Sequence, residues 1–111
     1  MKRLFLTLVV AVFLLGETMT AHAYNYTVNG MQCYCSISNQ RSVMAYTACS
    51  NTTVTIRSTA YNSAGGSIIT NGDARSGYAS VNYTTNQDIS YTIQVHEAPS
   101  LGESITLVEF A

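Results

Sequence analysis

The stretch NTTVTIRSTAY, from Asn51 to Tyr61, decides the fold class of this 111-residue chain. Its side chains alternate, so that Val54, Ile56 and two small residues lie on one side of an extended backbone, and threonines, an arginine and a tyrosine lie on the other. The stretch is rich in β-branched residues and contains neither glycine nor proline, which favours a long strand. We therefore predict a half-buried β-strand here, with the other segments arranged around it.

Shorter runs of alternating side chains precede and follow this stretch. They cover residues 24–28, 31–37, 43–49, 67–70, 78–84, 89–95 and 104–110. Asn29-Gly30 favours a tight hairpin turn, Ser50-Asn51 is expected to end a strand, and Asn71-Gly72 indicates a second turn or the start of a longer loop. No segment after residue 23 has the apolar spacing of a helix. The sequence therefore predicts an all-β, antiparallel, immunoglobulin-like β-sandwich of about seven to eight short strands.

The same alternation predicts which side chains share a face of the sheet. Met31, Cys33, Cys35 and Ile37 share one face, and so do Val43, Ala45, Thr47 and Cys49. In the run 89–95, an apolar stripe is formed by Ile89, Tyr91, Ile93 and Val95. We expect such stripes to line the core, because burial of apolar side chains drives folding.

The first 23 residues have the features of a secretory signal peptide. Lys2 and Arg3 precede the apolar run Leu4–Leu15, and Ala21 and Ala23 supply the small residues that signal peptidase accepts. The run is shorter than the roughly 20 residues of an ordinary transmembrane helix, and no second apolar run follows it. We therefore predict a signal peptide over residues 1–23, a mature domain over residues 24–111 without a membrane span, and a secreted or cell-envelope location.

The predicted mature domain carries few charges. Its cations are Arg41, Arg57 and Arg75, and its anions are Asp73, Asp88, Glu97, Glu103 and Glu109, which gives a net charge of −2. A weakly acidic domain without lysine has no basic surface for a phosphate backbone, which disfavours nucleic acid as a partner. Binding to an anionic membrane surface is disfavoured for the same reason.

The three cysteines, Cys33, Cys35 and Cys49, lie in a part of the chain that export would place in an oxidising compartment, where disulfides form. A three-residue turn over Gln40–Ser42 would place Cys33 opposite Cys49 and predicts a disulfide between them. A register shifted by two residues would favour Cys35 with Cys49 instead. Either bridge leaves one thiol, which is expected to be buried or to link two copies of the chain in a dimer.

His96 is the only histidine of the predicted mature domain. Beside Glu97 it could act as a general base, but the sequence places no nucleophile with it, and we interpret His96 as a solvent-facing residue at the end of a strand. The Cys-x-Cys pair has no second ligand motif to complete a metal site. We therefore predict no catalytic residues, no metal and no cofactor.

Eight tyrosines and no tryptophan give the domain its aromatic surface. An exposed strip for a glycan or a protein is predicted from Tyr34, Tyr46, Tyr61 and Tyr78. The alternative is that these rings form ordinary cross-strand pairs. Asn25, Asn51 and Asn82 match the acceptor pattern for N-glycosylation, and chance matches are expected in a chain this rich in Asn and Thr.

Several stretches resemble small exported β-sandwich proteins of unknown function from Gram-positive bacteria. These stretches are YNYTVNG at 24–30, TTVTIRSTAYNSAG at 52–65, YASVNYT at 78–84 and IQVHEA at 93–98. The Cys33-Tyr34-Cys35 segment is also similar to the Cys-x-Cys segment of the periplasmic immunoglobulin-like curli accessory protein. There the segment lies later in the domain and a third cysteine such as Cys49 is not part of the pattern, so this likeness implies no activity.

From these features we expect a secreted, non-enzymatic protein that binds a glycan or a protein at the cell surface. Two other functions stay open at this point. One is a thiol-active or metal-binding envelope factor that uses the Cys-x-Cys segment. The other is a secreted antibacterial toxin.

Overall fold

All six described strands belong to one antiparallel sheet, which confirms the predicted all-β class. The computed structural model describes residues 21–111, so the predicted signal peptide lies outside the described residues except for its last three positions. The elements are β1 (Ala21–Val28), β2 (Met31–Ser38), β3 (Ser42–Tyr61), β4 (Ser67–Thr84), β5 (Tyr91–Ala98), a 3-10 turn η1 (Pro99–Leu101) and β6 (Glu103–Phe110). No helix of these residues is long and apolar enough to span a bilayer.

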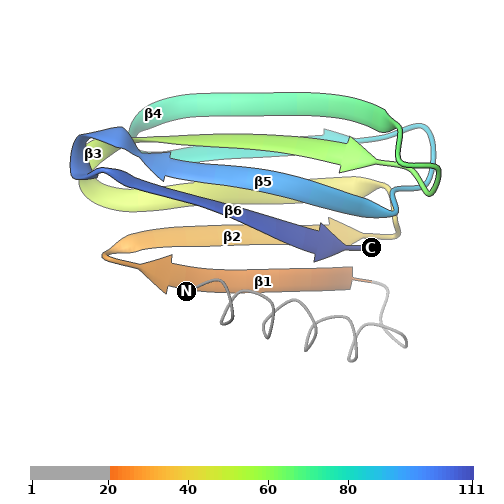
Figure 1. The fold of residues 1–111 in the computed structure, drawn as a ribbon, viewed down its shortest axis with the longest axis horizontal. Coiled ribbons are helices and arrows are strands. Elements are labelled where there is room, and N and C mark those ends of the chain that lie inside the picture. The colour runs from red at the N-terminus through yellow and green to blue at the C-terminus, as the bar shows by residue number, and fades with distance from the viewer. Residues whose placement is uncertain (1–20) are drawn as a thin grey trace.

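The longest strands, β3 and β4, form a hairpin that runs through the whole molecule and bends back on itself (Figure 1). Residues 42–48 of β3 pair with β2 and with residues 78–84 of β4, whereas residues 55–61 pair with β5 and with the beginning of β4. We call β1, β2 and the paired residues 42–48 and 78–84 the lower half of the sheet. The upper half consists of β5, β6 and the remaining parts of β3 and β4.

The prediction of seven to eight short strands is wrong, because β3 and β4 each continue through an expected break. Asn51 adopts a φ of 60° where the register between β3 and β4 shifts between Ala48 and Thr53, and Gly77 adopts a φ of 82° in the facing strand. Such a bulge bends a strand without ending it. Asn71-Gly72 lies inside β4 and is not a turn.

The two halves face each other, and β6 contacts β1 and β2 on the side away from the β3–β4 hairpin. The sheet therefore nearly closes on itself like a barrel, with the core between its halves. Side chains from both halves fill this core, and most of those predicted to face it do so. The buried apolar residues include Met31, Cys33, Cys35, Ile37, Val43, Ala45, Val54, Ile56, Ala60, Ala79, Val81 and Leu107.

The predicted core face of β5 is wrong. Thr92, Gln94 and His96 are fully buried, whereas the apolar Ile93 and Val95 lie half-buried on the outer face. The pairing of β5 with β3 explains the inversion, because Gln94 lies opposite the inward-facing Ser58. Paired residues of neighbouring strands point to the same side of a sheet.

The turns before the bend are short and well defined. Asn29 and Gly30 have φ values of 48° and 82°, as a type I′ hairpin requires, so the predicted turn is confirmed. The next turn consists of Asn39–Arg41 instead of Gln40–Ser42, because Asn39 and Gln40 both adopt positive φ. Ser38 therefore pairs with Ser42, and the register of β2 and β3 differs by two residues from the predicted one.

Candidate functional site

Three of the four predicted tyrosines lie side by side on the outer face of the lower half. Tyr34 stacks on Tyr46 with ring centroids 4.9 Å apart, and Tyr46 packs against Tyr78 at 5.0 Å. Tyr78 ends the row on β4 and is 50% exposed, so one side of its ring is open to solvent. Period-two alternation and the strand register together explain why one row of rings crosses β2, β3 and β4.

The side chains around these rings are uncharged and mostly polar, with the exposed Met44 two positions from Tyr46 on β3. The side-chain amide of Gln32 donates to the Tyr46 hydroxyl at 3.0 Å and to Oδ1 of Asn25 at 3.2 Å. We define the tyrosine face as Tyr34, Tyr46, Tyr78, Asn25, Gln32, Ser80 and Asn82. No side chain pointing outward from the paired residues of β1, β2, β3 and β4 in the lower half is charged.

The hydroxyl of Tyr46 stays protonated at physiological pH. Partial desolvation, followed by the neighbouring Tyr78 and Tyr34, raises the pKa of Tyr46, while the hydrogen bond from Gln32 opposes this shift. The tyrosine face therefore presents neutral hydroxyls and amides, which can both donate and accept hydrogen bonds.

Tyr61, the fourth predicted tyrosine, is not part of this face. It lies on the outer face of the upper half, where it stacks on Tyr91 at 4.8 Å, and Tyr91 packs against Phe110 at 6.2 Å. The bend in β3 separates Tyr61 from Tyr46, although both are on the same strand. Each half of the sheet thus carries its own row of three aromatic rings.

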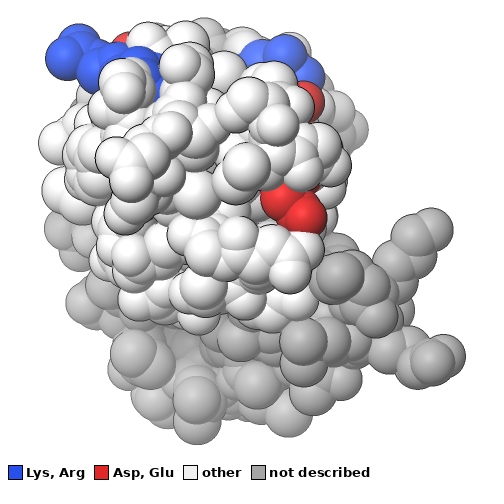
Figure 2. Space-filling model, turned by 90° about the vertical axis from the view of Figure 1, so that its left-hand side faces the viewer, with Lys and Arg blue, Asp and Glu red and all other residues white. Residues whose placement is uncertain are grey.

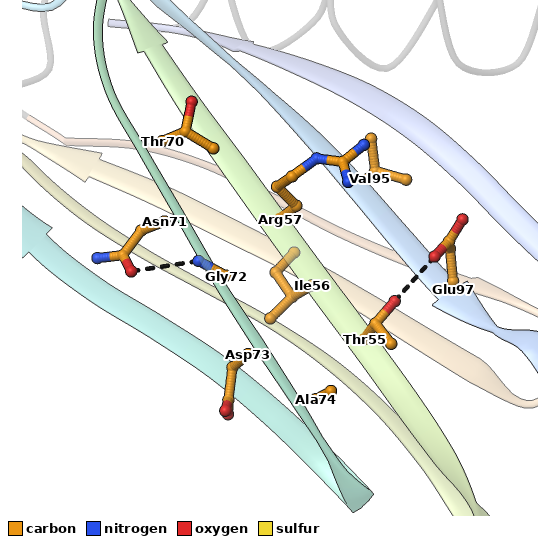
Figure 3. A pocket seen from close by; sticks show the side chains of 10 residues that line it. All are labelled: Thr55, Ile56, Arg57, Thr70, Asn71, Gly72, Asp73, Ala74, Val95 and Glu97. Carbon is orange, nitrogen blue, oxygen red and sulfur yellow. Dashed lines mark hydrogen bonds between the residues drawn. The ribbon is translucent and has the colours of Figure 1, made fainter.

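A shallow, open groove of about 500 Å³ lies on the upper half (Figure 3). It is lined by Thr55, Ile56, Arg57, Thr70, Asn71, Gly72, Asp73, Ala74, Val95 and Glu97. Gly72 gives the groove its floor, since a Cβ at this position would lie 3.2 Å from the carbonyl oxygen of Ile56. No pattern in the sequence indicates this groove, because its lining comes from three strands.

The charges in this groove are largely satisfied within the protein. Glu97 accepts hydrogen bonds from Thr55 at 3.0 Å and from Ser104 at 3.5 Å. Asp73 accepts from Arg75 at 3.1 Å and from the backbone N–H of Ser80 at 3.1 Å. Asp73 points to the opposite side of the sheet from Arg57, since it lies opposite the inward-facing Ile56. The outer face of the groove thus carries the cation Arg57 and the engaged anion Glu97, which leave no strong field of either sign, so the groove is a weaker candidate for a ligand than the tyrosine face.

A chain of hydrogen-bonded polar side chains crosses the core between the two halves. Thr47 Oγ1 lies 2.8 Å from Nδ1 of His96, and His96 Nε2 lies 2.7 Å from the Tyr24 hydroxyl. The Tyr24 hydroxyl donates to Oε1 of Gln94 at 3.1 Å, and Nε2 of Gln94 donates to Ser58 Oγ at 3.1 Å. The chain ends where Ser58 meets the Tyr83 hydroxyl at 2.8 Å.

The order of donors along this chain follows from the Gln94 amide. Its carbonyl oxygen can only accept, so the single proton of the Tyr24 hydroxyl points to Gln94. His96 Nε2 must then donate to Tyr24, and Nδ1 accepts from Thr47. Every member is satisfied in this arrangement, which is the condition under which a buried polar network stabilises a core.

The interpretation of His96 as a solvent-facing residue is wrong: its exposure is 0%. Burial lowers the pKa of His96 to about 3, and the carbonyl of Tyr46 opposes this shift. Glu97 points to the outer face and so cannot pair with His96 across the strand. The sequence missed this network because threonine, serine, glutamine and histidine at inward positions look like exposed residues.

Glu109 is a second buried titratable group that the sequence did not indicate. Its side chain is 2% exposed, and Oε2 has no hydrogen-bond partner among the described residues. Burial raises the pKa of Glu109 to about 8, so the carboxyl group is protonated at neutral pH. Facing Glu109 are the Tyr24 hydroxyl and the Cys35 thiol, whose pKa values burial also raises.

The three cysteines are free thiols, and the predicted Cys33–Cys49 bridge and its Cys35–Cys49 alternative are not formed in the structure. The two-residue difference in register is the reason, since Cys33 lies opposite Thr47 and Cys35 opposite Ala45. Cys49 is the most exposed of the three at 8%. None of these thiols is exposed enough to form the intermolecular disulfide of the predicted dimer.

The thiols are also poorly suited to redox chemistry. Burial raises the pKa of Cys33 to about 12 and raises that of Cys35 further, whereas a reactive cysteine needs a lowered pKa and access to solvent. Cys35 contacts only the Thr92 hydroxyl, at 3.9 Å, in a polar interaction. Residues 21–111 contain no group of three His, Cys, Asp or Glu side chains placed to hold a metal ion.

We expect iodoacetamide to modify none of the three cysteines of the native protein at pH 8 within an hour, and all three in denaturant. All three thiols are buried, and the raised pKa values of Cys33 and Cys35 lower the reactivity of those two further, so labelling requires unfolding. Mass spectrometry of the intact protein counts the added groups directly. Rapid labelling of a native cysteine, or a mass two units low that shows a disulfide, would contradict this expectation.

Comparisons of the chain with models of protein families, with curated proteins and with solved structures found no match.

Proposed function

We propose that this protein is an exported, non-enzymatic binding protein and that its tyrosine face contacts an uncharged glycan at the cell surface. The row Tyr34–Tyr46–Tyr78 is the observation that carries the proposal. A half-exposed ring at the end of that row offers a flat apolar surface to the C–H groups of a sugar. The hydroxyls and amides beside it offer the hydrogen bonds that sugar hydroxyls need.

The shape and charge of the lower half favour a polysaccharide over a small ligand. The rings cover each other's faces where they stack, so the row presents ring edges and hydroxyls in a line across three strands and one open ring face at Tyr78. An extended chain of sugar units can follow such a line. The outward side chains there carry no charge, so an anionic or cationic polymer gains nothing from long-range attraction. Figure 2 shows how sparse charge is elsewhere, with a few small groups on an otherwise uncharged side of the molecule.

Export over residues 1–23, the immunoglobulin-like type of sandwich and kinship with small exported β-sandwich proteins belong to the same proposal. A protein at the envelope meets glycans at high local density, so weak contacts suffice for retention there. A protein partner would use the same aromatic face, since tyrosine is enriched at protein interfaces. We favour a glycan because the amides and hydroxyls here are exposed and uncharged.

The replacement Tyr78→Ala is expected to weaken binding to a neutral polysaccharide about tenfold, which corresponds to about 1.4 kcal/mol. The purified protein would be sedimented with insoluble cellulose, chitin or cell-wall peptidoglycan, and the bound fraction measured against polysaccharide concentration. Tyr78 is chosen because its ring is 50% exposed and ends the row, so its loss disturbs packing least.

Tyr91→Ala is the matched control, because Tyr91 belongs to the aromatic row of the upper half. It is expected to leave binding unchanged, although Tyr91 contacts two rings and its loss disturbs more packing than the loss of Tyr78. No retention on any of the three polysaccharides would refute the glycan proposal. Equal losses from Tyr78→Ala and Tyr91→Ala would show that the tyrosine face is not the contact surface.

A further inference from the structure

Asn29 and Gly30 form the tip of the β1–β2 hairpin, beside the edge strand β6. The last paired residues before the tip are Val28 and Met31. The side-chain amide of Asn29 donates to Oε2 of Glu103, the first residue of β6, at 2.5 Å. The strands β1 and β6 contact each other without pairing, so this hydrogen bond connects two edges of the sheet.

An asparagine that precedes glycine can lose ammonia without an enzyme. The backbone nitrogen of the glycine attacks Cγ of the asparagine, a C–N bond forms, and the side-chain nitrogen leaves as ammonia with the proton of the attacking N–H. Water then opens the resulting cyclic imide at either carbonyl and gives aspartate or isoaspartate. Glycine favours ring closure, because it has no Cβ beside the attacking nitrogen.

The setting of Asn29-Gly30 leaves this reaction open. Both residues are exposed, and a Cβ built on Gly30 would have no atom within 4 Å. Within residues 21–111, the Gly30 N–H donates no hydrogen bond, and the bond to Glu103 is the one that the Asn29 side chain must give up. Neither residue belongs to a strand, so the rotation that brings Gly30 N to Asn29 Cγ breaks no strand pairing.

The second Asn-Gly pair, Asn71-Gly72, has the same two residue types in a different setting. It lies within β4, where both residues pair with β3. Asn71 is half-buried, and the Gly72 N–H donates to Oδ1 of Asn71 at 3.2 Å (Figure 3). Ring closure at this pair requires the backbone of a paired strand to rotate, which breaks the pairing around it. The fold therefore protects Asn71 and leaves Asn29 reactive.

We propose that Asn29 is a site of spontaneous deamidation in the folded protein and that the modification weakens the contact between β1 and β6. Aspartate at this position replaces the N–H donor with a carboxylate that faces the carboxylate of Glu103, and like charges at such a distance repel each other. Isoaspartate also lengthens the backbone by one carbon atom. It therefore disturbs the two-residue type I′ turn, in which Asn29 and Gly30 have φ values of 48° and 82°.

Peptide mapping by mass spectrometry tests the site on the purified protein, held folded at pH 8 for several weeks. Asn29 is expected to deamidate about tenfold or more faster than Asn71. In denaturant the two are expected to react at similar rates, because the protection of Asn71 comes from the fold. The proposal would be overturned if Asn71 reacted as fast as Asn29 in the folded protein. It would also be overturned if Asn29 reacted no faster than Asn25 and Asn82, which precede tyrosine.

Variants at positions 29 and 103 test the effect on the contact between β1 and β6. Asn29→Asp reproduces the charge of one product and keeps the turn, since Asp-Gly also favours type I′. It is expected to lower the equilibrium constant of folding about twofold to fivefold, as measured by urea denaturation. In a chain that already carries Glu103→Gln, the same replacement is expected to cost nothing, because the glutamine amide donates to the new carboxylate.

The comparison of these two backgrounds separates repulsion across the contact from any effect on the turn itself. Glu103→Gln alone is the matched control for the second background. An unchanged folding equilibrium in Asn29→Asp would overturn the proposed effect of the modification. So would an equal loss with and without Glu103→Gln, because the carboxylate would then act without Glu103.

Discussion

Replacing Gln94 with alanine is expected to lower the free energy of unfolding by about 3 to 5 kcal/mol. Gln94 joins Tyr24 of the lower half to Ser58 of the upper half, with a hydrogen bond of 3.1 Å on each side. Its loss leaves two buried polar groups without their partners and opens a cavity between the halves. The measurement is urea denaturation followed by circular dichroism.

Gln87→Ala is the matched control, since Gln87 is exposed and its side chain accepts one long hydrogen bond, at 3.4 Å from Asn62. We expect it to change stability by about 0.5 kcal/mol or less. Tyr24→Phe removes a hydroxyl alone and is expected to cost about 1 to 3 kcal/mol. A cost below about 1 kcal/mol for Gln94→Ala would mean that the buried network contributes little to stability.

Stability is expected to be greatest on a plateau between about pH 4.5 and pH 6.5 and to fall on both sides of it. Below the plateau, an unfolded chain protonates His96 near pH 6.5, while the folded protein resists protonation down to about pH 3. Above it, an unfolded chain ionises Glu109 near pH 4.5, while the folded protein holds that proton up to about pH 8. Within the plateau, the rise in stability with pH that comes from His96 and the fall that comes from Glu109 oppose each other.

Each limb has its own diagnostic substitution. Glu109→Gln is expected to flatten the fall in stability between pH 6.5 and pH 8, worth at most about 2 kcal/mol, because no proton is then released on unfolding. His96→Gln is expected to flatten the acid limb, although it lowers stability overall by disturbing the network. Midpoints of urea denaturation across the pH range give both limbs. The assignment would be contradicted if Glu109→Gln left the fall above pH 6.5 unchanged, or if His96→Gln left the fall at acid pH unchanged.

The alternation in sequence predicted much of the lower half. In β2 every second residue from Met31 is buried, and in β3 the core positions before and after the bend are those expected. The Asn29-Gly30 turn was also predictable, because few sequences favour positive φ at two successive residues. These features depend on local backbone preference and on apolar side chains, which sequence patterns represent well.

The interior of β5 could not be predicted from apolar pattern alone. Its inward residues Thr92, Gln94 and His96 are polar, and they are buried because partners from distant strands satisfy them. Tyr24 and Gln94, for example, are 70 positions apart in sequence. A rule that places apolar side chains inside therefore assigned the wrong face to this strand.

The continuity of β3 and β4 was missed for a related reason. Asn51 and Asn71-Gly72 have the composition of turns, yet strand pairing continues past both of them because β3 and β4 support each other. The split between Tyr46 and Tyr61 follows from that bend, and so the predicted four-ring strip became two rows. The disulfide prediction was wrong because the turn between β2 and β3 begins one residue earlier than expected. The resulting difference of two residues in register changes every cross-strand partner of β2 and β3.

Because both halves share the β3–β4 hairpin, there is no boundary between them at which they could separate. A strand of 20 residues belongs to both, so melting either half exposes the core of the other. Unlike two domains joined by a linker, these halves gain or lose their structure together, and no half-folded form can display one aromatic row without the other.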